Sequence, residues 1–115
     1  MLIQNYNPNW KTDFNNIKAT LLDKLNSLEI NIEHVGSTSV QGMSAKSIID
    51  IDIVYMKSEA FESIKKSLEA IGYYHNGNQE IEGREVFKRI SNSGHAVLDR
   101  ISHHLYVCHK ENAEL

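Results

Sequence analysis

The sequence predicts a small α/β (α+β) domain, with a mixed β-sheet of about four or five strands and two long helices on one face. Two segments repeat their apolar side chains at steps of three and four, as helices do. Between them, Ile48–Val54 is β-branched except for two aspartates, as in a central strand. Because each apolar stripe needs a sheet face to cover, both helices are expected to pack on the same layer.

The two helices are delimited by residues that commonly start or end helices. The first is expected to begin near Pro8, and its apolar stripe comprises Trp10, Phe14, Ile17, Leu21, Leu25 and Leu28. The second is expected to be capped by Ser58 and ended by Gly72. Its apolar stripe comprises Phe61, Ile64, Leu68 and Ile71. Both stripes are interpreted as core packing.

The other strands are expected in the sequence both before and after the second helix. Residues 31–35 run into a glycine turn, and a short strand begins at Tyr73, before the turn signal of residues 75–78. Residues 83–90 follow another glycine. The turn at 91–94 is expected to return the chain, through Val97 and Leu98, to a strand that begins near His103. These last two strands are therefore expected to pair antiparallel.

Length and composition indicate a single domain over residues 1–115. Apolar residues make up 41% of the chain, enough for one core. The net charge of −3 argues against a general nucleic-acid binder, because phosphate contacts need a basic face. The sequence has no apolar run of membrane-spanning length, and a single cysteine, Cys108, excludes an internal disulfide. We therefore expect a cytoplasmic protein without a membrane partner.

Asp50 and Asp52 give the strongest chemical signal. Side chains two apart on a strand share a face, so these carboxylates are separated by about 7 Å along the backbone. Left ionised in an apolar sheet, they would repel each other and lose hydration. Mg²⁺ accepts one or two carboxylates together with phosphates and waters. The pair is therefore predicted to bind Mg²⁺ or Mn²⁺ and to be catalytic, the alternative being a half-exposed edge strand.

The turn before the aspartates predicts a phosphate site. Gly36 allows the backbone to approach a ligand closely, and Ser37, Thr38 and Ser39 can cap a short following helix. The free amides of a helix N-terminus bind anions. The order of strand, Gly-Ser turn, short helix and aspartate strand is that of nucleotidyltransferases of the polymerase-β type. The alternative is that Gly36 only makes a turn.

A basic group follows in the strand expected over residues 83–90. Arg84 and Lys88 share one face of this strand, whereas Arg89 points to the other. Guanidinium groups suit triphosphate oxygens, so all three are candidates for phosphate binding. An edge strand protected from aggregation by its charges explains them equally well.

The histidines do not predict a zinc site. His103 and His104 are adjacent and so point to opposite faces of a strand, and Cys108 and His109 add donors without tetrahedral ligand spacing. A histidine beside the aspartate strand could instead bind a phosphate or transfer a proton. His104 is the candidate, with a structural role as the alternative.

Several motifs together resemble the GrpB family of nucleotidyltransferase-like proteins. They are residues 6–10 (YNPNW), 33–40 (EHVGSTSV), 48–52 (IIDID) and 103–108 (HHLYVC), with Phe14, Gly42, Ala45 and Lys46 between them. The resemblance implies a nucleotide-binding fold and adds Lys46 to the expected phosphate-binding residues. The family typically continues into further C-terminal helices. This chain is therefore expected to lack them, and to cover the sheet surface they leave with a partner or a second copy.

Two functions fit these observations. The first is a Mg²⁺-dependent nucleotidyltransferase that binds a nucleoside triphosphate and transfers a nucleotidyl group to an acceptor that the sequence does not identify. The second is a noncatalytic nucleotide-binding module, or an accessory module of the CoA pathway. A third carboxylate near the aspartates would favour the enzyme. The positions expected opposite the aspartates are His104 and Tyr106, and the acidic candidates are Glu80, Glu82, Glu85 and Asp99.

Overall fold

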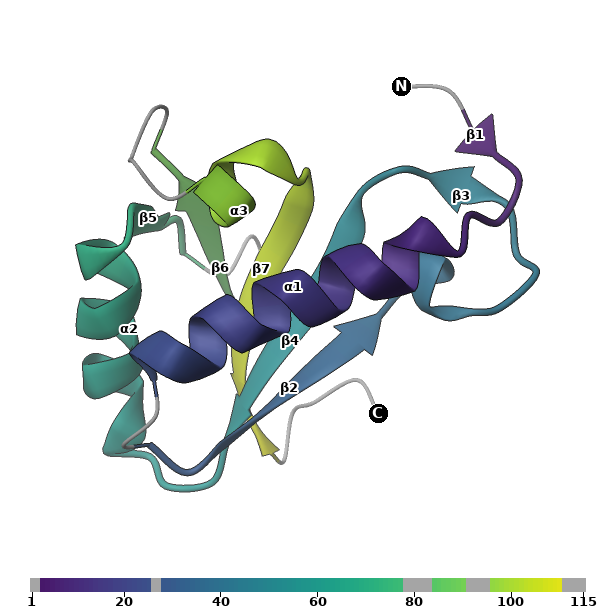
Figure 1. The fold of residues 1–115 in the computed structure, drawn as a ribbon. Coiled ribbons are helices and arrows are strands. Elements are labelled where there is room, and N and C mark those ends of the chain that lie inside the picture. Colours follow the sequence, from purple (N-terminus) through teal and green to yellow (C-terminus); the bar gives the residue numbers. More distant parts are fainter. Residues whose placement is uncertain (1–2, 26–27, 78–83, 91–95, 111–115) are drawn as a thin grey trace.

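The computed structural model of this chain describes residues 3–25, 28–77, 84–90 and 96–110. Its main feature is a five-stranded mixed sheet in the order β2-β4-β7-β6-β5 (Figure 1). β4 and β7 pair parallel at the centre, and every other neighbouring pair is antiparallel. A separate two-stranded sheet pairs β1 with β3. The predicted α/β class and the mixed sheet are confirmed.

Along the chain, the helices are interspersed among the strands. In order they are β1 Ile3–Gln4, α1 Asn9–Lys24, β2 Ile30–Val35, η1 Ser37–Ser39, β3 Ala45–Lys46, β4 Ile49–Tyr55, α2 Ala60–Ala70, β5 Tyr73–His75, β6 Arg84–Arg89, α3 Ala96–Arg100 and β7 His103–His109.

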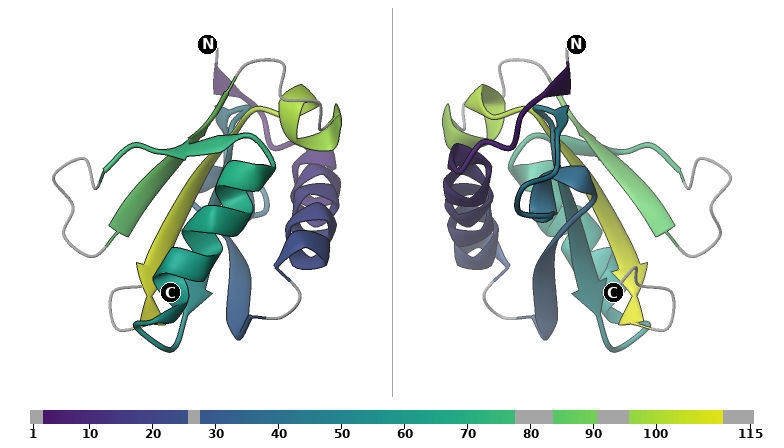
Figure 2. Two further views of the ribbon diagram at one scale, coloured as in Figure 1. Left: turned by 90° about the vertical axis from the view of Figure 1, so that its left-hand side faces the viewer. Right: turned by 90° about the vertical axis from the view of Figure 1, so that its right-hand side faces the viewer.

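The core lies between the sheet and its helices. Figure 2 shows α1 and α2 on the same side of the sheet, as predicted. Ile49, Ile51 and Ile53 face this side from β4 and are at most 1% exposed. The apolar stripes of both helices join them in one cluster, which includes Trp10, Phe14, Ile17, Leu21, Leu25, Ile64, Leu68 and Ile71. Sheet and helices therefore share a single core.

Three local features differ from the sequence-based expectation. The second helix begins at Ala60 rather than directly after Ser58, and no side chain caps it. The short helix after Gly36 is one 3-10 turn. Val97 and Leu98 return the chain to β7 through a short helix, α3, because Leu98 fills the core from there. The turn expected at residues 91–94 lies outside the described residues.

The sheet face away from the helices carries both polar and apolar side chains. Val54, Val86 and Cys108 point to this side and are buried within the chain itself. These apolar side chains need no partner to be buried. The expected partner or second copy on this face stays a prediction. No helix in the described parts of the chain is long and apolar enough to span a membrane.

Candidate functional site

The two aspartates share the sheet face opposite the helices, as their spacing predicts. The parallel register of β4 with β7 pairs Asp50 with His104 and Asp52 with Tyr106. On the other side of β4, Asp52 pairs with Glu33 of β2. Asp50 keeps 30% of its side chain exposed, whereas the Asp52 side chain is 0% exposed. The two carboxylates therefore lie in different environments.

Gly36 brings the backbone of the turn against the Asp50 carboxylate. Its φ of 75° and ψ of −170° lie in a region that only glycine occupies readily. A Cβ added to Gly36 would overlap the Asp50 Oδ2 atom. The glycine is thus required twice, for its own conformation and for the position of the carboxylate.

A buried threonine, Thr38, connects the turn after Gly36 to the neighbouring strand β2. Thr38 is 2% exposed, and its hydroxyl lies 2.9 Å from Nε2 of His34. The His34 ring stacks on Phe14 of α1, with ring centroids 4.7 Å apart. Burial lowers the pKa of His34, and the Asp50 charge opposes this only in part. A neutral His34 therefore links the turn to α1.

A pocket of about 350 Å³ opens between this turn, β3 and the start of β4. It brings together five of the predicted site residues, Ser37, Thr38, Lys46, Asp50 and His104, with Ile3, Ser44, Ala45 and Ile48 completing its lining. His104 Nδ1 lies 3.0 Å from Asp50 Oδ1. We call this hollow the turn pocket.

A larger pocket, of about 690 Å³, adjoins the turn pocket, and Ile48 and His104 line both. Lys88 lines the larger pocket together with Tyr106 and His103. Lys88 therefore lines the larger pocket and not the turn pocket.

Asp52 lies against an arginine. Arg84 Nη2 is 3.5 Å from Asp52 Oδ1, and the Arg84 side chain is 13% exposed. The guanidinium carbon of Arg84 lies 3.6 Å from the centre of the Tyr106 ring. Since Tyr106 pairs with Asp52 in the sheet, Arg84 reaches from β6 across β7 to the aspartate. The sequence pattern identifies Tyr106 only as a non-acidic position opposite the aspartates, and does not predict its contact with Arg84.

The donors fit a divalent cation at one aspartate but not at both. Asp50 faces the turn pocket, where a single carboxylate can complete the shell of a Mg²⁺ held by phosphates and waters. Asp52 is buried and already ion-paired with Arg84. Among residues 3–25, 28–77, 84–90 and 96–110, no cluster of three or more His, Cys, Asp or Glu side chains could hold a metal ion.

The two described candidates for a third carboxylate, Glu85 and Asp99, have other partners than the aspartates. Glu85 points to the helix side of the sheet, where its Oε1 lies 2.7 Å from His75 Nε2. Asp99 is in α3 and pairs with Arg89. Glu80 and Glu82 lie outside the described residues. Glu33 of β2 is the acid in register with Asp52. The sequence does not predict this neighbour, because it does not specify which strands pair.

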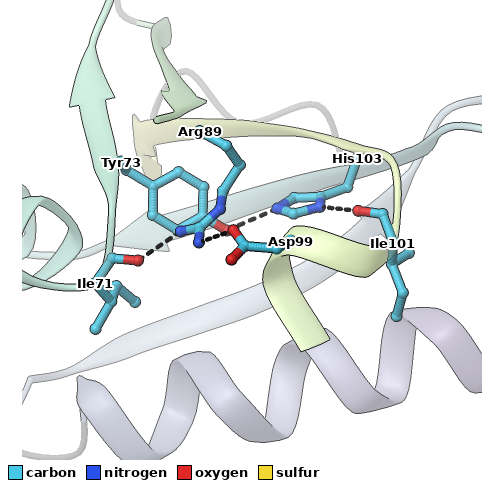
Figure 3. A network of polar contacts seen from close by, with 6 residues as sticks. All are labelled: Ile71, Tyr73, Arg89, Asp99, Ile101 and His103. Carbon is cyan, nitrogen blue, oxygen red and sulfur yellow. Dashed lines mark hydrogen bonds and ion pairs between the residues drawn. The ribbon is translucent and has the colours of Figure 1, made fainter. Parts of the chain in front are cut away.

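Arg89 belongs to another cluster, on the helix side of the sheet (Figure 3). Its guanidinium donates to the Ile71 carbonyl and to Asp99, each at 2.5 Å, and lies over the Tyr73 ring. The Tyr73 hydroxyl lies 2.7 Å from His103 Nε2. Arg84 therefore reaches an aspartate of β4, whereas Arg89 does not, because the two side chains point to opposite faces of β6.

Comparison with known proteins identifies a family. The model of the family described as GrpB protein matches residues 1–115. The protein YqkA of Bacillus subtilis is 32% identical over 107 residues, covering 93% of this chain and 29% of YqkA. The glutamate-rich protein GrpB of Alkalihalophilus pseudofirmus is 29% identical over 104 residues, covering 90% of this chain and 60% of that protein. The chain thus spans less than two thirds of the length of either relative.

Solved structures agree on the fold. The crystal structure of the conserved protein GrpB from Enterococcus faecalis superposes with a TM-score of 0.75 at 26% identity, covering 96% of this chain and 63% of that one. Cid1 in complex with the UTP analogue UMPNPP superposes with a TM-score of 0.62 at 14% identity, covering 94% of this chain and 32% of Cid1. At that identity the likeness shows the nucleotidyltransferase fold alone.

Proposed function

This chain belongs to the GrpB family, and we propose that it binds the phosphates of a nucleoside triphosphate in the turn pocket. The single observation that carries this proposal is the convergence of Ser37, Thr38, Lys46, Asp50 and His104 on one hollow. These residues come from four elements, η1, β3, β4 and β7, and the sequence pattern predicts each of them as a phosphate-binding or metal-binding residue.

The chemistry of the turn pocket suits a phosphate chain. Lys46 and His104 offer cationic or donor nitrogens, and Ser37 offers a hydroxyl beside the backbone of the 3-10 turn. The backbone at Gly36 has no side chain to keep a ligand away. Cid1, which has the same fold, is described in complex with a UTP analogue and, in another structure, as MgGTP-bound.

We assign Asp50 the role of the one protein carboxylate that meets a Mg²⁺ ion carried by the triphosphate. Without the cation, Asp50 would repel the phosphates. With it, the same charge attracts the complex. Nucleotide binding should therefore depend on divalent metal.

Nucleotide binding without transfer fits the described residues better than catalysis does. A polymerase-β-type transfer through two metals needs a third acidic group beside the pair. On β7 the residues in register with the aspartates are His104 and Tyr106. Glu33 of β2 is in register with Asp52, but the described residues include no cluster of three such side chains that could hold a metal ion. The larger pocket, which meets the turn pocket at His104, offers space for an acceptor if transfer occurs. A CoA-pathway accessory role has no separate support among the contacts of the site.

Calorimetric titration with ATP, GTP, CTP and UTP, with Mg²⁺ and with EDTA, tests this function. We expect Mg²⁺-dependent binding, and Lys46→Met should weaken it about tenfold, the effect of losing roughly 1.4 kcal/mol. Lys57→Met, at an exposed lysine outside the pocket, is the matched control. A folded wild-type chain that binds none of the four nucleotides would reject the proposal.

Asp50→Asn sharpens the test because it changes charge with little change in volume. We expect this variant to bind more weakly than wild type in Mg²⁺ but no more weakly in EDTA, where the lost charge was only repulsive. Equal weakening under both conditions would mean that Asp50 does not act through a cation.

A further inference from the structure

Asp52 differs from Asp50 in that its charge is enclosed by the protein. Its side chain is 0% exposed, and Val54 and Cys108, which point to the same sheet face, are buried as well. An ionised carboxylate taken out of water loses its hydration at a large cost unless an opposite charge lies nearby. The position of Asp52 therefore requires a cation.

We propose that the Arg84 guanidinium is the cation that serves Asp52, in the place where a nucleotidyltransferase of this fold would use a metal ion. Asp52 is then a positioning residue and not a metal ligand, and Asp50 is the only member of the pair that meets a metal. Asp52 and Arg84 would keep this pairing whether or not a nucleotide binds.

The geometry around Arg84 explains how an arginine can take this role. The guanidinium carbon lies 3.6 Å from the centre of the Tyr106 ring, and Nη2 lies 3.5 Å from Asp52 Oδ1. A planar, weakly hydrated guanidinium packs well on an aromatic face, unlike a lysine ammonium. Tyr106 thus provides an apolar platform that aims the charge at Asp52.

The sheet order makes this contact possible. β7 separates β4 from β6, and Arg84 pairs with Cys108 of β7. Arg84, Tyr106 and Asp52 share one face, so the arginine side chain can extend over β7 to β4. A Mg²⁺ ion at the same carboxylate would meet the positive charge of Arg84 at ion-pair distance, and like charges there repel strongly.

Unfolding by urea, followed by circular dichroism, tests the proposal without any nucleotide. Wild type, Asp52→Asn, Arg84→Met and the double variant are compared in EDTA and in millimolar Mn²⁺. We expect Arg84→Met to reduce the folding equilibrium constant at least about a hundredfold, because it removes the cation beside a buried carboxylate. The double variant should lose much less than the sum of the two single variants.

Asp52→Asn combined with Arg89→Met is the matched control, because Arg89 lies over a tyrosine but pairs with a different aspartate. Its two penalties should add. If Arg84→Met does not fold while the double variant does, the coupling is shown directly.

The metal arm separates the two possible cations. A wild-type midpoint that is equal in EDTA and Mn²⁺, or a Mn²⁺ effect that is lost in Asp50→Asn but kept in Asp52→Asn, supports the proposal. A Mn²⁺ stabilisation of wild type that disappears in Asp52→Asn overturns it, as do additive penalties for Asp52→Asn and Arg84→Met. Failure of nucleotide binding affects neither outcome, so the two proposals fail separately.

Discussion

Two clusters of the same three residue types lie on opposite faces of the sheet. On the pocket side, Arg84 lies 3.6 Å from the Tyr106 ring centre and 3.5 Å from Asp52. On the helix side, Arg89 lies 4.6 Å from the Tyr73 ring centre and 2.5 Å from its aspartate, Asp99. Both arginines come from β6, five residues apart and therefore on opposite faces.

The aspartates show that the two clusters do different work. The side chain of Asp99 is 29% exposed, and Arg89 also donates to the Ile71 carbonyl, so this cluster ties α3 and the end of α2 to the sheet. Asp52 is 0% exposed, and its arginine compensates a buried charge. Where water reaches the acid, as at Asp99, the residues Arg89, Tyr73 and Asp99 hold elements of the fold together, and we call this cluster the clamp. Where water does not reach the acid, as at Asp52, the arginine neutralises a buried charge.

The largest expected effect separates the two arginines. Arg84→Met should lower the free energy of unfolding by about 3–5 kcal/mol, the usual cost of breaking a buried ion pair. Arg89→Met should cost about 2–3 kcal/mol, since water can solvate Asp99 after the charged hydrogen bonds are lost. Urea unfolding of both variants measures the difference. Equal losses would mean that the burial of Asp52 does not matter.

A glycine pair tests how tightly the pocket side is built. Gly36→Ala should cost about 3 kcal/mol, because the residue is forced into a glycine-only conformation and its Cβ meets the Asp50 carboxylate. Gly42→Ala, at φ 86° with no heavy atom within 4 Å of an added Cβ, should cost only about 1 kcal/mol. Thermal or urea unfolding compares them, and similar losses would remove Asp50 from the explanation.

On the helix side, a tyrosine pair tests the clamp. His103 Nδ1 donates to the Ile101 carbonyl, which can only accept, so Nε2 of the neutral ring accepts from the Tyr73 hydroxyl. Tyr73→Phe should therefore cost about 1–2 kcal/mol by leaving a buried acceptor without its donor. Tyr74→Phe, at an exposed neighbour, should be nearly neutral. A neutral Tyr73→Phe would contradict this hydrogen-bond assignment.

The smallest expected effect is a pH dependence that comes from two histidines on the helix side of the sheet. Burial lowers the pKa of His34, under the turn, and of His103, beside the clamp. The unfolded chain then binds more protons than the folded chain just below the ordinary histidine pKa of 6.5. Stability therefore falls as the pH drops through that value and is level above it.

Unfolding curves between about pH 5 and 8 measure this slope around the ordinary histidine pKa. His103→Asn should make the slope shallower than in wild type. A stability that rises on acidification in this range would contradict the lowered pKa values of both histidines.

The sequence by itself determined the features that depend on local periodicity. Asp50 and Asp52 share a face because side chains alternate along a strand, and the same rule separates Arg84 from Arg89 and His103 from His104. The stripes of α1 and α2 follow from the helical repeat. Motifs near one another in the chain, from Gly36 to Asp50, also predict side chains that the structure places around one hollow, whereas His104 joins them from a distant strand.

Tertiary structure alone decided which side chains from distant segments meet. The order β4-β7-β6 places Tyr106 between Asp52 and Arg84, and no local pattern specifies the order of strands in a sheet. The sequence pattern does not distinguish Asp50 from Asp52, but their burial differs in the fold. Asp50 faces a pocket, whereas Asp52 faces an arginine. A charge is costly or harmless according to its access to water, and that access exists only once the sheet has assembled.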